Sequence, residues 1–301
     1  MPELPDITVY QQAMTTQLVG TVLVDVRLGS PFLLRSVLPP LQAVIGKKTL
    51  SIRRLGKRLV LAMEDEFFLV LHLMIAGRLH WKKAGCPLPK KTGQCAFDFE
   101  TGSMLLTESS SKKRASLFAV QGEAALEAHQ PGGINVLESP FEVFHQVLQS
   151  QNNTLKRALT DPKRFDGIGN AYSDEILYAA QLSPLQLTQN LDEAAAHRLW
   201  QATRETLSFW IDKLLAESGG GFPKKVTAFH KDMAVHGRFK LPCKRCEVPI
   251  QRIVKGEREV NYCPNCQTGG KMLADRAWSK LLKQDWPKTV EAWESIQKHR
   301  S

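Results

Sequence analysis

The chain has 301 residues, 43% of them hydrophobic, and a formal net charge of +10, which allows two ordinary domains and favours a polyanionic partner. Every apolar run is too short to span a membrane, and the acidic residues Glu3 and Asp6 stand where a signal peptide would be basic. These features argue against membrane-spanning and secreted classes, so we expect a cytoplasmic protein without a membrane partner.

The first part of the chain predicts one helix followed by short strands. The helix follows Pro5, with Asp6 as its N-cap, apolar residues at helical spacing from Ile7 to Leu18, and a stop at Gly20. The residues beyond it form short apolar or alternating runs separated by turn signals, which is typical of an antiparallel sandwich or barrel. We expect strands at Val22–Leu28, Thr49–Arg54, Arg58–Met63, Phe67–Met74, Cys95–Phe99, Met104–Thr107 and Ser116–Val120.

Beyond about Gly122 the strand pattern gives way to helices. The helices are expected at Pro140–Leu148, Thr154–Leu159, Asn170–Ala180 and Leu191–Leu215. Glycine-rich breaks at 131–133 and 218–221 predict the boundaries between domains. We expect a β-rich domain at 1–130, a helical domain at 131–222, a cysteine-containing region at 223–270 and an extension at 271–301. In the extension, apolar residues predict one or two amphipathic helices, namely Trp278, Leu281, Leu282, Trp286 and Trp293.

Four of the six cysteines form two CxxC pairs, Cys243/Cys246 and Cys263/Cys266, separated by sixteen residues. In a cytosolic chain this spacing favours metal binding over disulfides, and the intervening residues are long enough for a hairpin. Four thiolates suit one structural zinc ion, with an iron–sulfur site or free thiols as alternatives. Ten Lys/Arg against three Asp/Glu between Lys224 and Arg258 indicate that this region contacts nucleic acid.

The N-terminal sequence Met1-Pro2-Glu3 carries a possible nucleophile. Removal of the initiator methionine, which a small second residue favours, would expose the secondary amine of Pro2. An α-amino group has a pKa of about 8, so a useful fraction is nucleophilic near neutral pH. Attack on an aldehydic sugar carbon would give an iminium ion, an electron sink that promotes elimination. By itself such a start is common and has no functional meaning.

Six motifs in a fixed order make this start informative. The sequence resembles the formamidopyrimidine-DNA glycosylase and endonuclease VIII family at residues 1–6, 55–58, 72–78, 167–177, 235–238 and 263–267. The resemblance implies an α+β multidomain fold: an N-terminal antiparallel β-sandwich, a helix–two-turns–helix domain and a zinc finger. It also implies a bifunctional DNA glycosylase and abasic-site lyase of base excision repair that removes oxidised bases from duplex DNA.

The resemblance assigns four catalytic residues. Pro2 would attack the deoxyribose anomeric carbon, and Glu3 would donate a proton at the sugar. Lys57 would assist base excision and β-elimination, and Arg258 would grip the phosphate near the lesion and serve δ-elimination. A helix N-terminal residue is the alternative interpretation of Glu3, and a surface strand lysine is that of Lys57.

Further residues are expected to contact DNA. Lys156 and Asn170 are similar to the family's phosphate contacts, and Asn170 starts a helix whose dipole favours an anion. Arg238 belongs to another of the shared motifs. Because the target nucleotide must leave the stack, Ile75 or Met74 would fill the gap as an apolar wedge. Glu175 is expected either near the sugar or in a structural role.

The sequence also departs from the family. Where relatives carry an Asp-Pro-Arg-Arg-Phe-Gly loop, this chain has Ser111-Lys112-Lys113-Arg114-Ala115, so Lys113 and Arg114 are candidates for the gap without the aromatic wedge. The segment 218–235 also looks short, which favours oxidised pyrimidines or ring-opened purines over 8-oxoguanine. A non-catalytic damaged-DNA-binding protein of the same fold remains the alternative. In either case we expect a monomer that binds damaged double-stranded DNA without a small-molecule cofactor.

Overall fold

The structure, a computed structural model, describes residues 1–255, 258–274, 286–290, 292 and 295, without the side chains at 255 and 258. The chain divides into two compact units. Unit 1 comprises Met1–Gly132 and Phe209–Thr227, and unit 2 comprises Gly133–Ser208 and Ala228–Ser301. The helix α6 (Glu193–Ser218) contributes residues to both units.

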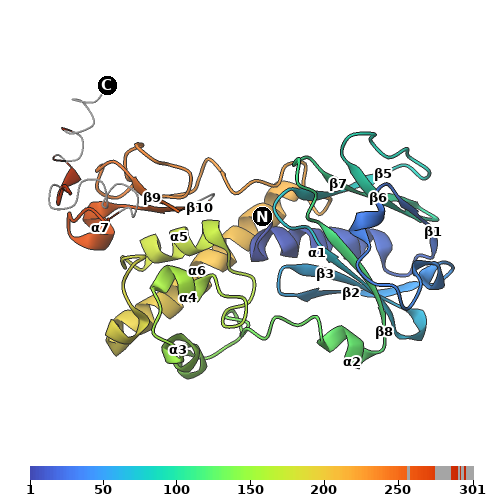
Figure 1. Ribbon diagram of the computed structural model, residues 1–301, viewed down its shortest axis with the longest axis horizontal. Coiled ribbons are helices and arrows are strands. Elements are labelled where there is room, and N and C mark those ends of the chain that lie inside the picture. The colour runs from blue at the N-terminus through green and yellow to red at the C-terminus, as the bar shows by residue number, and fades with distance from the viewer. Residues whose placement is uncertain (256–257, 275–285, 291, 293–294, 296–301) are drawn as a thin grey trace. The chain divides into compact units, whose positions relative to one another are not determined.

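Unit 1 contains two antiparallel sheets of four strands, in the orders β1-β6-β7-β5 and β2-β3-β4-β8 (Figure 1). One buried core joins the sheets and α1 (Leu4–Leu18), with Tyr10 from the helix, Phe97 from the first sheet and Leu61 from the second. The predicted antiparallel β-sandwich is therefore confirmed. The strands are β1 (Leu23–Leu28), β2 (Thr49–Leu55), β3 (Arg58–Met63), β4 (Phe67–His72), β5 (Gly77–Lys82), β6 (Gly93–Phe99), β7 (Gly102–Glu108) and β8 (Ser116–Gln121).

Two details of unit 1 differ from the prediction. Helix α1 begins at Leu4 with Glu3 as its N-cap, so Asp6 is not the cap but lies in the first turn. Pro5 fits there because the first turn needs no N–H from it. The strand β5 was not predicted, because it is an edge strand paired only with β7 and its side chains beyond Leu79 are part-buried or exposed. A short helix, α2 (Glu123–Glu127), closes the β-rich segment.

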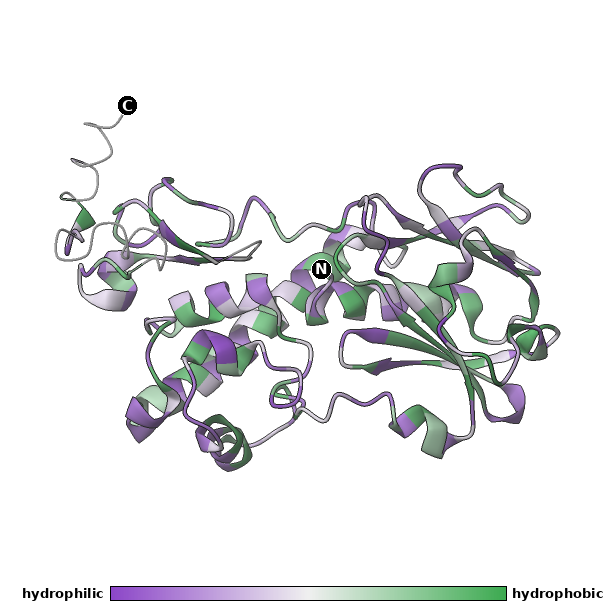
Figure 2. Ribbon diagram, in the orientation of Figure 1, coloured by the Kyte–Doolittle hydropathy of each residue, from purple (hydrophilic) through white to green (hydrophobic). Residues whose placement is uncertain are grey.

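Unit 2 contains the predicted helices and a two-stranded hairpin. The observed helix bounds lie within three residues of those predicted: α3 (Phe141–Gln149), α4 (Leu155–Leu159), α5 (Asn170–Ala179) and the first part of α6. Hydrophobic and hydrophilic residues alternate along these helices, as expected when one face is buried (Figure 2). The hairpin of β9 (Gln251–Lys255) and β10 (Arg258–Tyr262) joins the two cysteine pairs and is followed by α7 (Pro264–Thr268).

The C-terminal extension is described only in part. Trp278, Leu281, Leu282 and Trp293, on which the predicted amphipathic helices depended, lie outside the described residues. Trp286 is part-buried, and nearby the Met272 N–H donates to the Lys288 carbonyl at 3.0 Å. Across the described part of the chain, none of the helices combines the length and apolar character that a membrane crossing requires.

Candidate active site and zinc finger

The N-terminus lies among charged side chains of unit 1, with Met1 exposed and the residues that follow it buried. Pro2 is buried, its nitrogen lies in the peptide bond with Met1, and Glu3 is only 3% exposed. Burial lowers the pKa of the Met1 amine, the Glu3 carboxylate opposes that change, and the cations Arg78 and Lys57 reinforce it. Residues far apart in the sequence therefore share one electrostatic neighbourhood at the N-terminus, and Glu3 and Lys57 are among them.

Asp6 lies directly behind Glu3. Its Oδ2 accepts the Glu3 backbone N–H at 2.9 Å. Burial raises the pKa of Asp6 to about 7, and the Glu3 carboxylate acts in the same direction, whereas the Glu3 N–H bond and Arg78 act against it. Asp6 is thus partly protonated at neutral pH, so it adds less negative charge to the N-terminus than an ordinary carboxylate would.

Lys57 occupies the tip of a two-residue hairpin. Leu55 pairs with Arg58 across the β2–β3 turn, and Gly56 adopts φ +64, a conformation that favours glycine. Lys57 is therefore a turn residue and not, as its alternative interpretation had it, a strand residue. Arg58 lies opposite His72 in the β3–β4 register. Burial is the main cause that lowers the pKa of His72 to about 4, and the positive charges of Arg58 and Lys57 contribute in the same direction. His72 is consequently neutral at physiological pH.

Two loops of candidate wedge residues lie at the same end of the sandwich. The loop 73–76 leaves β4 where His72 pairs with Ser116, and it enters β5 where Gly77 pairs with Glu108. The loop 109–115 joins those same partners, Glu108 and Ser116, so the sheet registers place the loops side by side. A Cβ at Gly77 would lie 2.3 Å from the Leu73 carbonyl oxygen, which explains the glycine in this tight turn.

These loops present the predicted wedge residues in different ways. Ile75 is 52% exposed, and its neighbour Met74 adopts φ +49, which is strained for a residue other than glycine. Lys113 donates a hydrogen bond to the Glu108 carbonyl oxygen. The buried Glu108 carboxylate accepts the Arg114 N–H at 2.9 Å and so holds the backbone of this loop.

The segment after α6 packs on the sandwich of unit 1. Phe222 stacks on Trp81 with ring centroids 6.3 Å apart and interplanar angle 14°, and it also lies 6.3 Å from Tyr10. Arg78 Nε donates to the Val226 carbonyl at 3.1 Å. A cavity of about 460 Å³ lies beside this segment. Its lining consists of Asp6, Val9 and residues between 214 and 226.

The two predicted phosphate contacts of unit 2 already bond to protein atoms. The Lys156 ammonium, on a side chain only 9% exposed, donates to Asp174 Oδ1 at 2.5 Å and to the Asn170 carbonyl at 2.6 Å. Asn170 starts α5, as predicted, and its Nδ2 donates to the Glu259 carbonyl at 2.9 Å. The side chain of Arg258 lies outside the described residues, although its backbone begins β10.

Two further candidates are bound to backbone groups. Glu175 is buried, and its carboxylate accepts the backbone N–H groups of Ala234, Val235 and His236 at 2.7, 2.9 and 2.9 Å. Burial raises the pKa of Glu175, and these bonds oppose that change. This geometry favours the structural role that the sequence left open. Arg238 donates to the Pro242 carbonyl at 3.1 Å.

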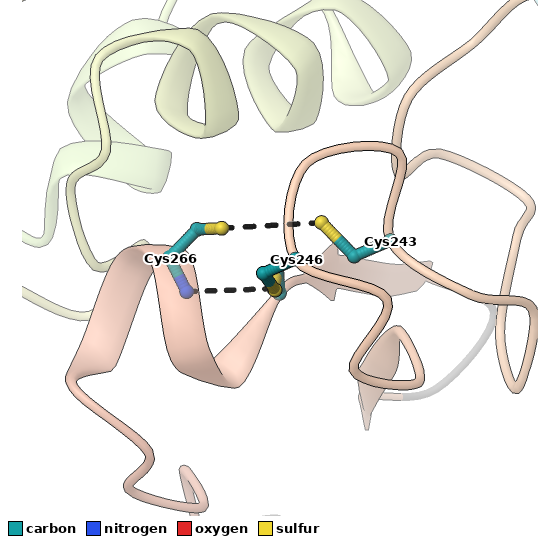
Figure 3. A group of neighbouring side chains, drawn as sticks. Cys243, Cys246 and Cys266 are labelled. Carbon is teal, nitrogen blue, oxygen red and sulfur yellow. Dashed lines mark hydrogen bonds between the residues drawn. The ribbon is translucent and has the colours of Figure 1, made fainter.

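The four cysteine sulfurs converge within 4.8 Å of one another. Figure 3 shows the sulfurs of Cys243 and Cys266 facing each other, 3.9 Å apart, and those of Cys246 and Cys263 are 3.4 Å apart. Tetrahedral zinc with Zn–S bonds of about 2.3 Å separates its sulfurs by roughly 3.8 Å, so the group fits zinc. The Cys266 and Arg245 backbone N–H groups donate to these sulfurs at 3.4 Å, as expected around thiolate ligands.

Comparisons with known proteins place the three segments in one family. A formamidopyrimidine-DNA glycosylase N-terminal domain matches residues 1–112, the H2TH domain of that enzyme matches 133–215, and a zinc finger found in FPG and IleRS matches 240–269. Formamidopyrimidine-DNA glycosylase of Variovorax paradoxus is 30% identical over 279 residues, covering 89% of this chain and all of the relative. The chain belongs to the formamidopyrimidine-DNA glycosylase family.

Other similarities agree with this assignment. Formamidopyrimidine-DNA glycosylase of Janthinobacterium is also 30% identical, over 285 residues that cover 89% of this chain and all of the relative. The Lactococcus lactis enzyme in complex with abasic-site DNA has the same fold, with a TM-score of 0.78 at 23% identity over 88% of this chain and 99% of that one. The predicted family, helix–two-turns–helix domain and zinc finger are thereby confirmed.

Several residues of the site in this family member were not predicted from the sequence. Arg78 and Asp174 both lie inside recognised motifs but received no role. Little in the sequence indicated a role for Asp174, because Ser173 and Glu175 flank it and only the structure shows that α5 is buried from Ala171 to Tyr178. Phe222 had no signal, because its contacts with Tyr10 and Trp81 join segments about 140 to 210 residues apart.

Proposed function

We propose that this family member is a bifunctional DNA glycosylase and abasic-site lyase that acts through the amine of Pro2. The observation that supports the proposal is that Glu3, Lys57 and Arg78, which come from three separate motifs, all act electrostatically on the amine at the N-terminus. Removal of Met1 would expose the Pro2 nitrogen in this setting. The same surroundings that lower the pKa of the Met1 amine would keep the proline amine neutral and nucleophilic.

The reaction would proceed in two stages. The Pro2 nitrogen attacks the anomeric carbon of the flipped nucleotide, and the bond to the damaged base breaks. Glu3 donates a proton to the ring oxygen of the sugar, the bond between that oxygen and the anomeric carbon breaks, and the nitrogen lone pair completes the iminium ion. The resulting iminium ion acidifies the neighbouring sugar protons, Lys57 assists their removal, and the 3′ phosphate leaves by β-elimination. Arg258 would hold the phosphate for δ-elimination. The cavity beside Asp6 offers room for the extruded base.

The partner would be double-stranded DNA with a damaged base, bound by a monomer. The wedge loops at 73–76 and 109–115 would enter the gap, and their juxtaposition supports this role. The finger would hold one structural zinc ion through Cys243, Cys246, Cys263 and Cys266, and the fit of their sulfurs supports this assignment. Zinc would act by fixing the finger and would take no part in a chemical step.

The role of Glu3 gives the test. Glu3→Gln keeps the size of the side chain but removes the acidic proton, so base excision from duplexes with oxidised pyrimidines should fall about 100-fold or more. Cleavage at a preformed abasic site should fall much less, because the base has already left. The exposed turn residue Glu100 provides the matched control, Glu100→Gln, which should leave both rates unchanged. Equal losses in both assays, or none, would contradict the proposed role.

A further inference from the structure

Asp174 is a buried carboxylate with every oxygen in use. It is 1% exposed on α5. Its Oδ1 accepts from the Lys156 ammonium at 2.5 Å, and its Oδ2 lies 2.7 Å from His236 Nδ1. The same Oδ2 accepts the Asn261 backbone N–H at 3.1 Å and the Asn261 side-chain amide at 3.3 Å. One side chain thus connects α4, α5, the segment before the finger, and β10.

Asn170 and Asp174 both form hydrogen bonds with the backbone of β10, and their spacing in α5 matches the spacing of their partners in the strand. Residues 170 and 174 are one helical turn apart and share a face of α5. Residues 259 and 261 are two apart in β10, so their outward backbone groups lie on one edge of the strand. Asn170 Nδ2 donates to the Glu259 carbonyl at 2.9 Å, and Asp174 accepts from the Asn261 N–H. Two side chains of α5 therefore take the place of a third strand beside the hairpin.

Burying this carboxylate is costly, and Lys156 offsets the cost. An ionised carboxylate in the interior loses its hydration and needs a paired cation and several donors to compensate. An apolar side chain would fill the same space without that cost. What an apolar residue would not supply is an acceptor for the outer edge of β10, where the N–H of Asn261 would be left without its bond.

We propose that Asp174 is a positioning residue that, with Asn170, fixes β10 on α5 and thereby sets the location of Arg258 at the start of that strand. This inference rests on the proposed function, in which Arg258 holds a phosphate near the lesion. Lys156 then serves as the buried counter-ion that stabilises the ionised carboxylate of Asp174. Lys156 would thus affect DNA binding only indirectly. A role limited to folding the finger would lower the amount of competent protein without affecting the contact made by Arg258.

A double-mutant cycle separates these roles. The variants are Asp174→Asn, Arg258→Gln and the double variant, and the probe is a duplex with an uncleavable tetrahydrofuran abasic analogue. Dissociation constants are taken for the binding-competent, zinc-loaded fraction, which stoichiometric titration and metal analysis define. Asp212→Asn, an exposed acid of α6 outside the network, is the matched control and should bind as the wild type does.

The positioning role predicts coupled losses. Each single variant should weaken binding about five-fold or more, and the double variant should be no more than about two-fold weaker than the weaker single one, because both changes remove one contact. Losses that multiply, or an Asp174→Asn variant that binds as the wild type does, would overturn the inference. A wild type that binds this duplex no better than undamaged DNA would instead contradict the proposed function.

A milder variant covers the case in which Asp174→Asn loses zinc. Asn261→Ala removes the side-chain amide, which donates to Asp174 at 3.3 Å and also lies near His236 Nδ1 and Glu259 Oε1, and it leaves the backbone N–H of Asn261 and the Lys156 pair in place. In the same double-mutant cycle with Arg258→Gln, Asn261→Ala should weaken DNA binding less than Asp174→Asn does. The double variant should again bind little more weakly than the weaker of its two single variants. A loss that multiplies with that of Arg258→Gln would overturn the inference.

Discussion

Asp6 illustrates how burial changes the chemistry of an ordinary carboxyl group. It lies in the first turn of α1, where a carboxylate would normally be favoured by the helix dipole. Burial nevertheless raises its pKa to about 7. The folded protein therefore binds this proton more tightly than the unfolded chain does, and stability linked to Asp6 is present at low pH and is lost as pH rises through about 7.

Asp6→Asn should remove this pH dependence, because the amide stays neutral and can still accept the Glu3 N–H. The melting temperature of the variant relative to the wild type should rise between pH 5 and pH 8 by at least about 5 °C, because two pKa units correspond to about 2.7 kcal/mol and 1 kcal/mol to roughly 2–4 °C in domains of 150–250 residues. Thermal denaturation at both pH values measures this difference. A difference that stays constant with pH would contradict the raised pKa.

Some residues of the site could be predicted individually and others could not. Glu3 and Lys57 follow from short motifs, and the structure places both near the N-terminus. The choice between two roles for Glu175 could not be made from its motif, because the backbone donors that bind it come from residues 234–236, about 60 positions later. The sequence shows that residue 175 carries a carboxylate, but only the structure shows which N–H groups donate hydrogen bonds to it.

Helices and strands could be predicted from the periodicity of apolar residues wherever one face of the element is buried and the other is exposed. Seven of the eight strands of unit 1, the N-terminal helix and the four helices predicted between residues 140 and 215 were found, because an apolar face recurs along each of them. Strand β5 was missed for the opposite reason, since an edge strand needs few apolar residues. The contacts of β10 with α5 could not be predicted either, because they are hydrogen bonds between side chains of α5 and the backbone groups at the outer edge of β10.

The zinc finger offers a test at the level of an element. Cys246→Ser should abolish zinc binding and unfold the β9–β10 hairpin, because a finger of this size depends on its metal for most of its stability. Metal analysis and thermal denaturation would measure both losses. Cys86→Ser, at a part-buried cysteine outside the cluster, should retain zinc. Full zinc content in Cys246→Ser would contradict the four-cysteine site.

For the whole molecule, the net charge of +10 has a measurable consequence. If the proposed DNA complex releases counterions from about five phosphates, the logarithm of the binding constant should fall against the logarithm of salt concentration with a slope of about −4.5. Titration of an abasic-analogue duplex at several salt concentrations gives the slope. A nearly flat profile would contradict binding through phosphate contacts.

Borohydride trapping reports whether the amine of Pro2 attacks the sugar. Processed protein, with removal of Met1 verified by mass, is incubated with an abasic-site duplex and borohydride. We expect a covalent adduct that maps to Pro2 and that is absent when an N-terminal extension blocks the amine. An adduct at a lysine instead of Pro2 would contradict this role of Pro2. No adduct from the processed protein would contradict it as well and would favour a protein that only binds damaged DNA.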